Sequence, residues 1–175
     1  MSDPRPLRSF DPPAALAPES GWSEPSEPLL PRGLGRPFVS GEPEGDRVRI
    51  RYFQRDSDRA LVARAWFGPG TEGPPGHVHG GSMAAVLDEA MGLGCWIVGR
   101  KVLAGRLDVR FRAVLPLGSL VTVEAWVEHV DGRHVTTRGR IVGADGTVHA
   151  KGEGLFVELT DAQIDAMRER WAAGL

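Results

Sequence analysis

The sequence lacks features that would place it in several common functional classes. It has one cysteine, Cys95, so it forms neither an internal disulfide nor a site of several thiolates. Its 21 Lys and Arg do not outnumber its 23 Asp and Glu, and a net charge of -2 provides no basic surface for nucleic acid. No apolar run approaches the roughly 20 residues that cross a bilayer, and no signal-peptide core opens the chain. We therefore predict a cytoplasmic protein that inserts into no membrane and binds no nucleic acid.

The chain divides by its proline content. Its 175 residues, 41% hydrophobic and 25% charged, have the balance of one ordinary globular domain. Ten of the 14 prolines lie between Pro4 and Pro43. Because proline resists both helix and central strand, we predict a flexible leader over residues 1–44 and a folded domain over residues 45–175. Three apolar residues of the leader could still anchor it to the domain surface: Phe10, Trp22 and Phe38.

Six segments alternate apolar and polar residues, which is the pattern of half-buried strands. They span residues 47–54, 60–67, 106–114, 120–130, 134–142 and 148–159. The first two form a hairpin around Asp56 to Asp58, and Asp131-Gly132 and Asp145-Gly146 supply hairpin turns for the last three. We predict an antiparallel sheet followed by a short helix, which a capping box of Thr160 and Gln163 opens.

One segment between these strands has the composition of a buried helix. Residues 81–98 contain no proline and only two charges, and their apolar residues surround the helical circumference. Such a helix is about 27 Å long. It is too apolar to lie on the outside of a sheet, and the chain offers no partner helices with which it could form a bundle. The sequence therefore predicts an α+β fold in which the sheet wraps around this central helix.

The segment that introduces the helix is rich in glycine and proline. Gly80 and Gly81 leave the first N–H groups of the helix uncovered, where the helix dipole adds about half a positive charge. Such a place can hold a carbonyl oxygen that becomes negative during acyl transfer. The alternative is that the two glycines only allow close packing.

Two adjacent carboxylates, Asp88 and Glu89, lie about two turns into the helix among apolar residues. Burial there raises the pKa of a carboxyl group and suits it to act as a base near neutral pH. The alternatives are an exposed pair or a buried partner for an arginine.

Asp88 lies nine residues after His79, which is about 13 Å along a helix and too far for both to act on one small group. Two antiparallel helices across a twofold axis would close that distance, so we predict shared sites in a homodimer or homotetramer.

The motif Gly73-Pro74-Pro75-Gly76-His77-Val78-His79-Gly80-Gly81, with Asp88 nine residues after His79, resembles the signature of hotdog-fold acyl-CoA thioesterases of the PaaI-like branch. The strands from Gly105 onward and the turn at Pro116 resemble that family too, so the likeness covers about residues 45–159. It implies a single hotdog domain that hydrolyses acyl-CoA to free acid and CoA without a cofactor.

The resemblance also implies roles for residues. Asp88 would attack the thioester or activate a water, the amide of Gly80 or Gly81 would hold the carbonyl oxygen, and His79 would position the thioester. Candidate substrate-binding residues are His77, Ser82, Glu89 and Arg110. Two positions depart from many relatives: Gly73 stands where they carry Asn, and Ala104 where others carry Thr.

Other interpretations remain beside these. His77 is either a structural hydrogen-bonder or a catalytic substitute, and His77 with His79 lacks a third ligand, so no metal is predicted. Arg110 lies on a polar strand face that is either solvated or touches CoA phosphates. Cys95 is predicted to pack in the core. A non-catalytic acyl-CoA binding or sensing module would need the same pocket without a base, and a hydratase would need a histidine signature that we do not find.

Overall fold

The computed structural model describes residues 10–26, 29 and 37–173 of the 175-residue chain. The strands are β1 (Trp22–Ser23), β2 (Val48–Arg55), β3 (Leu61–Phe67), β4 (Val102–Phe111), β5 (Ser119–Asp131), β6 (His134–Gly143) and β7 (Val148–Glu158). The helices are α1 (Gly80–Trp96) and α2 (Asp161–Ala172), and a short 3-10 turn, η1 (Pro69–Thr71), follows β3.

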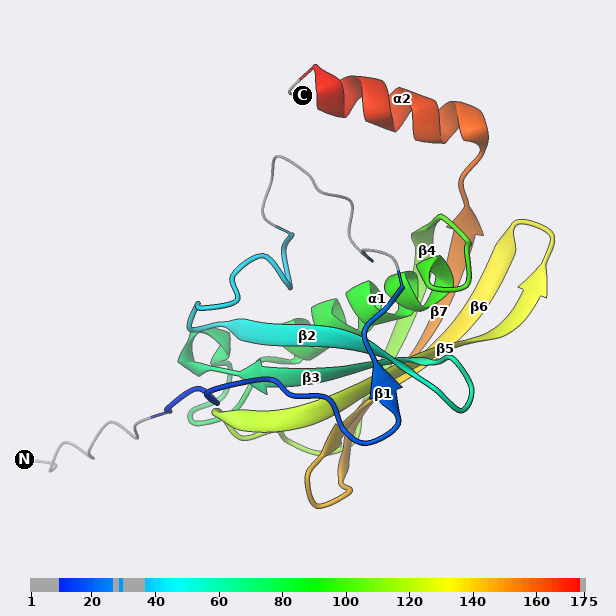
Figure 1. Cartoon of the computed structure of the whole chain (residues 1–175). Helices are drawn as coiled ribbons and strands as arrows, with labels where there is room; N and C mark the ends of the chain where they lie inside the picture. Colours follow the sequence, from blue (N-terminus) through cyan, green and yellow to red (C-terminus); the bar gives the residue numbers. More distant parts are fainter. Residues whose placement is uncertain (1–9, 27–28, 30–36, 174–175) are drawn as a thin grey trace, which may run out of the picture.

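All seven strands join one sheet in the order β1-β2-β3-β5-β6-β7-β4, and every neighbouring pair is antiparallel. The sheet curves around α1, which lies along its concave face (Figure 1). The predicted α+β architecture, one antiparallel sheet wrapped around a central helix, is confirmed. The strand expected from residue 106 begins earlier, because Val102 to Ala104 pair with β7 before a bulge at Gly105.

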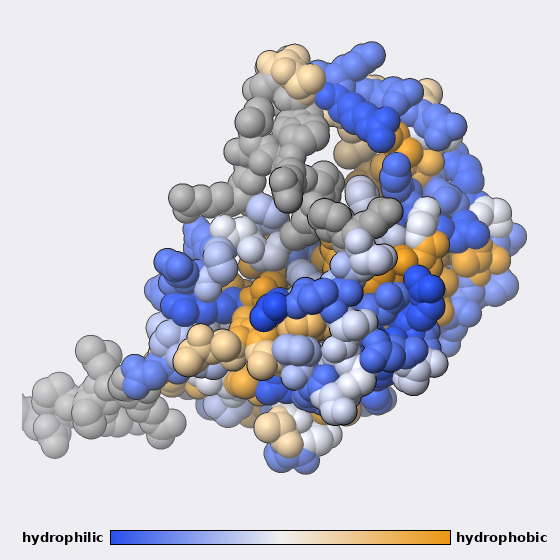
Figure 2. Space-filling model, in the orientation of Figure 1, coloured by the Kyte–Doolittle hydropathy of each residue, from blue (hydrophilic) through white to orange (hydrophobic). Residues whose placement is uncertain are grey.

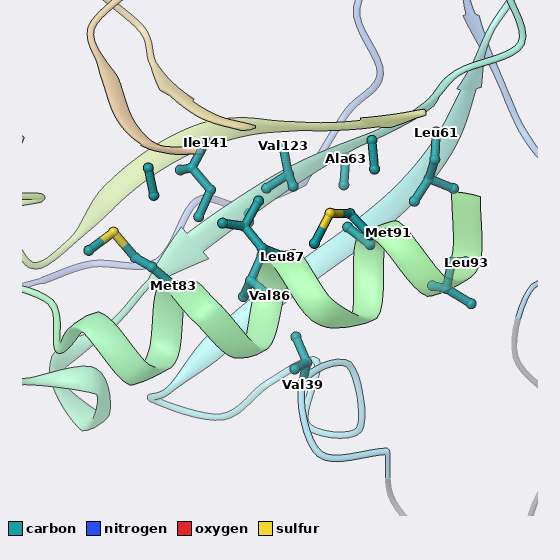
Figure 3. Close-up of a cluster of buried hydrophobic side chains, with 14 of the residues drawn as sticks. Val39, Leu61, Ala63, Met83, Val86, Leu87, Met91, Leu93, Val123 and Ile141 are labelled. Carbon is teal, nitrogen blue, oxygen red and sulfur yellow. The ribbon is translucent and has the colours of Figure 1, made fainter. Parts of the chain in front are cut away.

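The core forms where α1 meets the sheet. Met83, Leu87 and Met91 point from the helix toward the strands. They belong to the same hydrophobic cluster as Val123 and Ile141 of the sheet (Figure 3). Two glycines, Gly139 and Gly152, face each other across β6 and β7 beneath the helix. A Cβ atom at either position would come within 3.0 to 3.2 Å of Met91. The missing side chains therefore allow the helix to lie close against the sheet.

The helix is not buried on every side, as its composition had suggested. Its sheet-facing residues are buried, but Ala85, Asp88 and Gly92 on the remaining side are only half-buried. A single sheet can cover one side of a helix, and small residues line the side that is left. This side of α1 carries one of the two predicted carboxylates.

Residues before Gly45 also contact the domain. β1 pairs with the outer edge of β2, and the ring of Trp22 lies 5.9 Å from that of Phe53. Val39 is buried beside Val86 on the side of α1 away from β5 (Figure 3). Phe38 is 77% exposed. The division of the chain at residue 45 stays a prediction, and residues 1–9, 27–28 and 30–36 of the predicted leader lie outside the described residues.

The C-terminal helix α2 stands away from the sheet (Figure 1). Its predicted capping box is confirmed: the Thr160 N–H donates to Oε1 of Gln163 at 3.0 Å, and the Gln163 N–H donates to Oγ1 of Thr160 at 3.3 Å. Across the visible surface, hydrophobic areas are broken up by hydrophilic side chains (Figure 2). Among the described residues, neither helix has the length and apolar character needed to span a membrane.

Candidate active site

The segment that leads into α1 is a tightly connected loop, residues 73–79, which we call the histidine loop. It closes on itself through hydrogen bonds from the Gly73 N–H to the His77 carbonyl and from the His77 N–H to the Pro74 carbonyl, both 2.9 Å long. Gly76 adopts the positive φ of 76° that the turn needs. The Val78 N–H donates to the carbonyl of Leu115, in the segment after β4, at 2.8 Å. The loop is thereby fixed relative to the sheet.

His79 ends this loop and caps α1. Its N–H donates to the Thr71 carbonyl at 2.7 Å, and its ring Nδ1 accepts from the Gly81 N–H at 2.9 Å. A ring nitrogen that accepts a hydrogen bond carries no proton, so the neutral imidazole has its proton on Nε2. His79 is exposed. The cap therefore presents an N–H donor at the start of the helix.

The two glycine amides predicted to hold an oxyanion differ in their hydrogen bonding. The Gly81 N–H is used by His79, whereas the Gly80 N–H makes no hydrogen bond to any described residue. The close packing around His79 and the helix start requires glycine at positions 73 and 80. A Cβ at Gly80 would lie 3.1 Å from the ring of Phe111, and one at Gly73 would lie 2.7 Å from Cα of His79. The free donor at the helix start is Gly80.

Asp88 lies two turns further along α1 on its open side. It is half-buried, and burial raises the pKa of its carboxyl group. None of the described residues gives its side chain a hydrogen bond or an ion pair. A carboxylate that is partly desolvated and free of partners can accept a proton or attack an electrophile.

The neighbouring Glu89 faces a different element. The Tyr52 hydroxyl, on β2, donates to Oε1 of Glu89 at 2.7 Å. Tyr52 is 8% exposed, and burial, followed by the negative charge of Glu89, raises the pKa of its hydroxyl. Glu89, predicted to bind substrate, therefore has a protein partner within the fold.

A cavity of about 380 Å³ opens beside the helix start. His79, Gly81 and Ser82 line it, and so does Ala85, about one turn further along α1. These predicted site residues are thus brought together. Asp88 does not line the cavity, and a helical rise of about 1.5 Å per residue places it about 13 Å from His79 along the same helix.

Two other predicted substrate-binding residues, His77 and Arg110, do not line this cavity. His77 uses its ring Nδ1 in a 2.9 Å contact with the Pro75 carbonyl inside the loop. Arg110 forms an ion pair of 3.3 Å with Asp108 and lies in a separate groove of about 620 Å³ on the polar strand face. Cys95 is buried, and burial raises the pKa of its thiol to about 12, so the thiol is inert, as its predicted packing role requires.

Several contacts in the site could not be predicted from the sequence. Tyr52 and Glu89 are 37 residues apart, and no spacing relates a strand residue to a helix residue across the core. Thr71, whose hydroxyl donates to the Gly68 carbonyl at 2.7 Å, supports the backbone that holds His79. Among the residues that the structure describes, no group of three His, Cys, Asp or Glu could hold a metal ion.

Comparison with known proteins gives consistent results. Residues 75–150 match the family described as the thioesterase superfamily. An acyl-coenzyme A thioesterase THEM4 from Xenopus laevis is 33% identical over 117 residues, which are 65% of this chain and 53% of that protein. The chain thus spans about half the length of this curated relative.

Solved structures agree with this comparison. A thioesterase superfamily protein, 33% identical, superposes with a TM-score of 0.60 over 63% of this chain and 54% of its own. The PaaI protein from the phenylacetic acid degradation operon of E. coli superposes with a TM-score of 0.57 over 65% of this chain and 80% of its own. Since its identity is 18%, that second likeness is one of fold.

Proposed function

We propose that this protein hydrolyses an acyl-CoA thioester to a free acid and CoA, because residues 75–150 match the thioesterase superfamily and the sheet wraps around α1 as in the thioesterase structures it resembles. One observation carries the proposal: the Gly80 N–H at the start of α1 has no partner among the described residues, and a partner-free, half-buried Asp88 lies on the open side of the same helix.

The reaction follows from these groups. The thioester carbonyl oxygen accepts a hydrogen bond from the Gly80 N–H, where the helix dipole stabilises the negative charge of the tetrahedral intermediate. The Nε2–H of His79 donates to the same thioester group and orients it. Asp88 either removes a proton from the attacking water or attacks the carbonyl carbon itself, and water then hydrolyses the resulting anhydride. The carbon–sulfur bond breaks, and CoA leaves as its thiol once the thiolate is protonated.

Within one chain, His79 and Asp88 lie about 13 Å apart along α1, too far apart to act on one small group. We propose a homodimer, or a homotetramer built from it, in which two α1 helices lie antiparallel across a twofold axis. Gly92, a half-buried residue without a side chain on the open side of α1, supports a close approach of two helices there. Each site then combines the Gly80 end of one chain with the Asp88 of the other.

The proposal is tested by the release of free thiol from a panel of acyl-CoAs, from short aliphatic to aryl. We expect hydrolysis of at least one substrate class, with CoA and free acid formed in equal amounts. Tight binding of acyl-CoA without any release of thiol would instead make the protein a non-catalytic acyl-CoA binding or sensing module. We also expect the activity in the cytoplasmic fraction of its cells.

A further inference from the structure

The cavity beside the helix start is built mostly by residues outside the family match. Seven of its eleven lining residues precede residue 75, where that match begins. They come from three places: residues 38–42, the start of β2, and the turn η1. Most of the cavity lining therefore precedes the part of the chain that the family model matches.

Its outer wall, residues 38–42, is held in place. Val39 is 7% exposed and belongs to the hydrophobic core, where it lies beside Val86 of α1 (Figure 3). Hydrogen bonds then fix the connection to β2: the Gly68 N–H donates to the Arg47 carbonyl at 2.7 Å, and the Gly70 N–H to the Asp46 carbonyl at 2.9 Å. These contacts make the wall part of the folded domain.

The lining of the cavity selects for an uncharged ligand. Val39, Val48 and Ala85 present apolar side chains from three different segments. The one arginine, Arg47, forms an ion pair of 3.3 Å with Glu42, so its charge is already offset. A ligand with its own negative charge would have to compete with Glu42 for that guanidinium.

We propose that this cavity receives the acyl group of the substrate, and that it accepts uncharged apolar acyl groups of intermediate size. This rests on the hydrolysis proposed above. His79 and Gly81 line the cavity, and Gly80, with the free N–H, lies between them in the chain. An acyl group whose carbonyl oxygen is held at Gly80 therefore extends into the cavity. A volume of about 380 Å³ is near the lower end of small-molecule pockets, which limits the length of acyl chain that the cavity can hold.

The size limit is set from two sides, because Ala85 lines the cavity from α1 and Val48 lines it from β2. Ala85→Leu and Val48→Phe each add side-chain volume to the cavity lining and leave His79, Gly80 and Asp88 unsubstituted. Val130→Phe is the matched control, since Val130 is a half-buried strand valine that lines none of the cavities described. Circular dichroism and size-exclusion chromatography establish that each variant is folded and assembled like the wild type.

The test measures kcat/KM for straight-chain acyl-CoAs of increasing length. For the wild type we expect kcat/KM to rise to an intermediate length and then to fall. Both cavity variants lower kcat/KM for the longest acyl group that the wild type accepts by at least about 10-fold, the effect of one or two misplaced methylene groups, and leave acetyl-CoA within about threefold. Val130→Phe leaves the whole length profile unchanged. A profile that is the same in the wild type, the cavity variants and the control overturns the proposal.

Binding of S-alkyl-CoA thioethers, measured by calorimetry, separates this proposal from hydrolysis itself, because a thioether cannot be cleaved. Length-dependent binding that Ala85→Leu and Val48→Phe weaken about 10-fold for the longer alkyl groups supports the cavity even if the wild type hydrolyses nothing. Affinity that is independent of alkyl length, or equal in the wild type and both variants, contradicts it even if hydrolysis is observed.

Discussion

At the residue scale, the environment of Asp88 decides its chemistry. Its carboxyl group is half-buried, and burial raises its pKa. Glu89, the next residue, points to β2 and bonds to Tyr52. The fold therefore separates two adjacent carboxylates into one with a structural partner and one that is free to react.

We predict that Asp88→Asn lowers kcat by a factor of about 100 or more, the usual contribution of a general base. In the wild type, Asp88 must be ionised to act, so kcat/KM falls as the pH drops through its raised pKa, and this acid limb starts at a higher pH than an exposed aspartate would give. Thiol-release assays across pH test both points. Glu89→Gln should change kcat much less, and a dead Glu89→Gln with an active Asp88→Asn would contradict our assignment.

The same raised pKa gives a stability test. The folded state holds the Asp88 proton more tightly than the unfolded chain, so this group destabilises the fold as the pH rises through the folded-state pKa. Asp88→Asn removes that effect. Its melting temperature at neutral pH should equal or exceed that of the wild type, and a lower one in calorimetry would indicate that Asp88 has a structural role.

Tyr52→Phe should destabilise the protein by about 1–3 kcal/mol, because it leaves the partly buried Glu89 carboxylate without its hydrogen bond. Glu89→Gln is the control, since an amide oxygen still accepts from the Tyr52 hydroxyl. Denaturant unfolding measures both variants. Equal stability of Tyr52→Phe and the wild type would show that the bond contributes nothing.

The identity of the residues alone predicted which carboxylates and glycines form the candidate site. The carboxylates stood out because the helix has no other charge, and the glycines because they open it. Which amide is free did not follow from the sequence, since it depends on the ring of His79 bonding to Gly81. The partner of Glu89 depends on where the fold places Tyr52 of β2 relative to α1, which no local pattern encodes.

At the element scale, the contact between α1 and the sheet depends on glycine. A Cβ at Gly139 would lie 3.1 Å from the Glu124 carbonyl oxygen and 3.2 Å from both Leu87 and Met91. Because a strand backbone yields little, we predict that Gly139→Ala destabilises the fold by about 1–3 kcal/mol. Thermal and denaturant unfolding test this.

Gly94→Ala is the control for that prediction, because its Cβ would meet Ala125 atoms of β5 only at 3.6 Å or more. It also replaces a glycine inside a helix, so it should leave stability unchanged or raise it by up to about 1 kcal/mol. If both variants lose the same stability, close packing at Gly139 is not the cause.

The elements themselves were largely predictable. The alternation of apolar and polar residues predicted the strands. The Asp-Gly pairs predicted the hairpin turns, where Gly132 and Gly146 adopt positive φ. Sheet order was not predictable: β4 pairs with β7 rather than with β5, its neighbour in sequence. That pairing joins residues between 39 and 56 positions apart and depends on how the sheet closes around α1.

At the scale of the whole molecule, residues 19–23 pack on β2 and β3 of the sheet. β1 extends the sheet beside β2, Trp22 packs near Phe53, and Glu19 pairs with Arg64 at 2.8 Å. Deleting residues 1–26 should therefore lower the melting temperature by at least about 2–4 °C, the effect of roughly 1 kcal/mol in a domain of this size. Activity should persist, since His79, Gly80 and Asp88 are retained.

Calorimetry and thiol release on the truncated protein test this prediction, with Trp22→Ala in the full chain as a smaller change in the same direction. An unchanged melting temperature would show that β1 adds nothing to stability. Loss of activity in a folded, assembled protein would instead link these residues to the site.

The most direct test of the account is subunit mixing, because it asks whether each hydrolytic site combines the helix start of one chain with Asp88 of another. Asp88→Asn and His79→Ala are prepared separately, each nearly inactive, then unfolded and refolded together. In a mixed dimer one site carries both changes and the other carries neither. About half of the dimers are mixed at random, so we predict recovery of about a quarter of wild-type activity. Mixing that is verified by mass spectrometry but restores no activity would contradict the shared site.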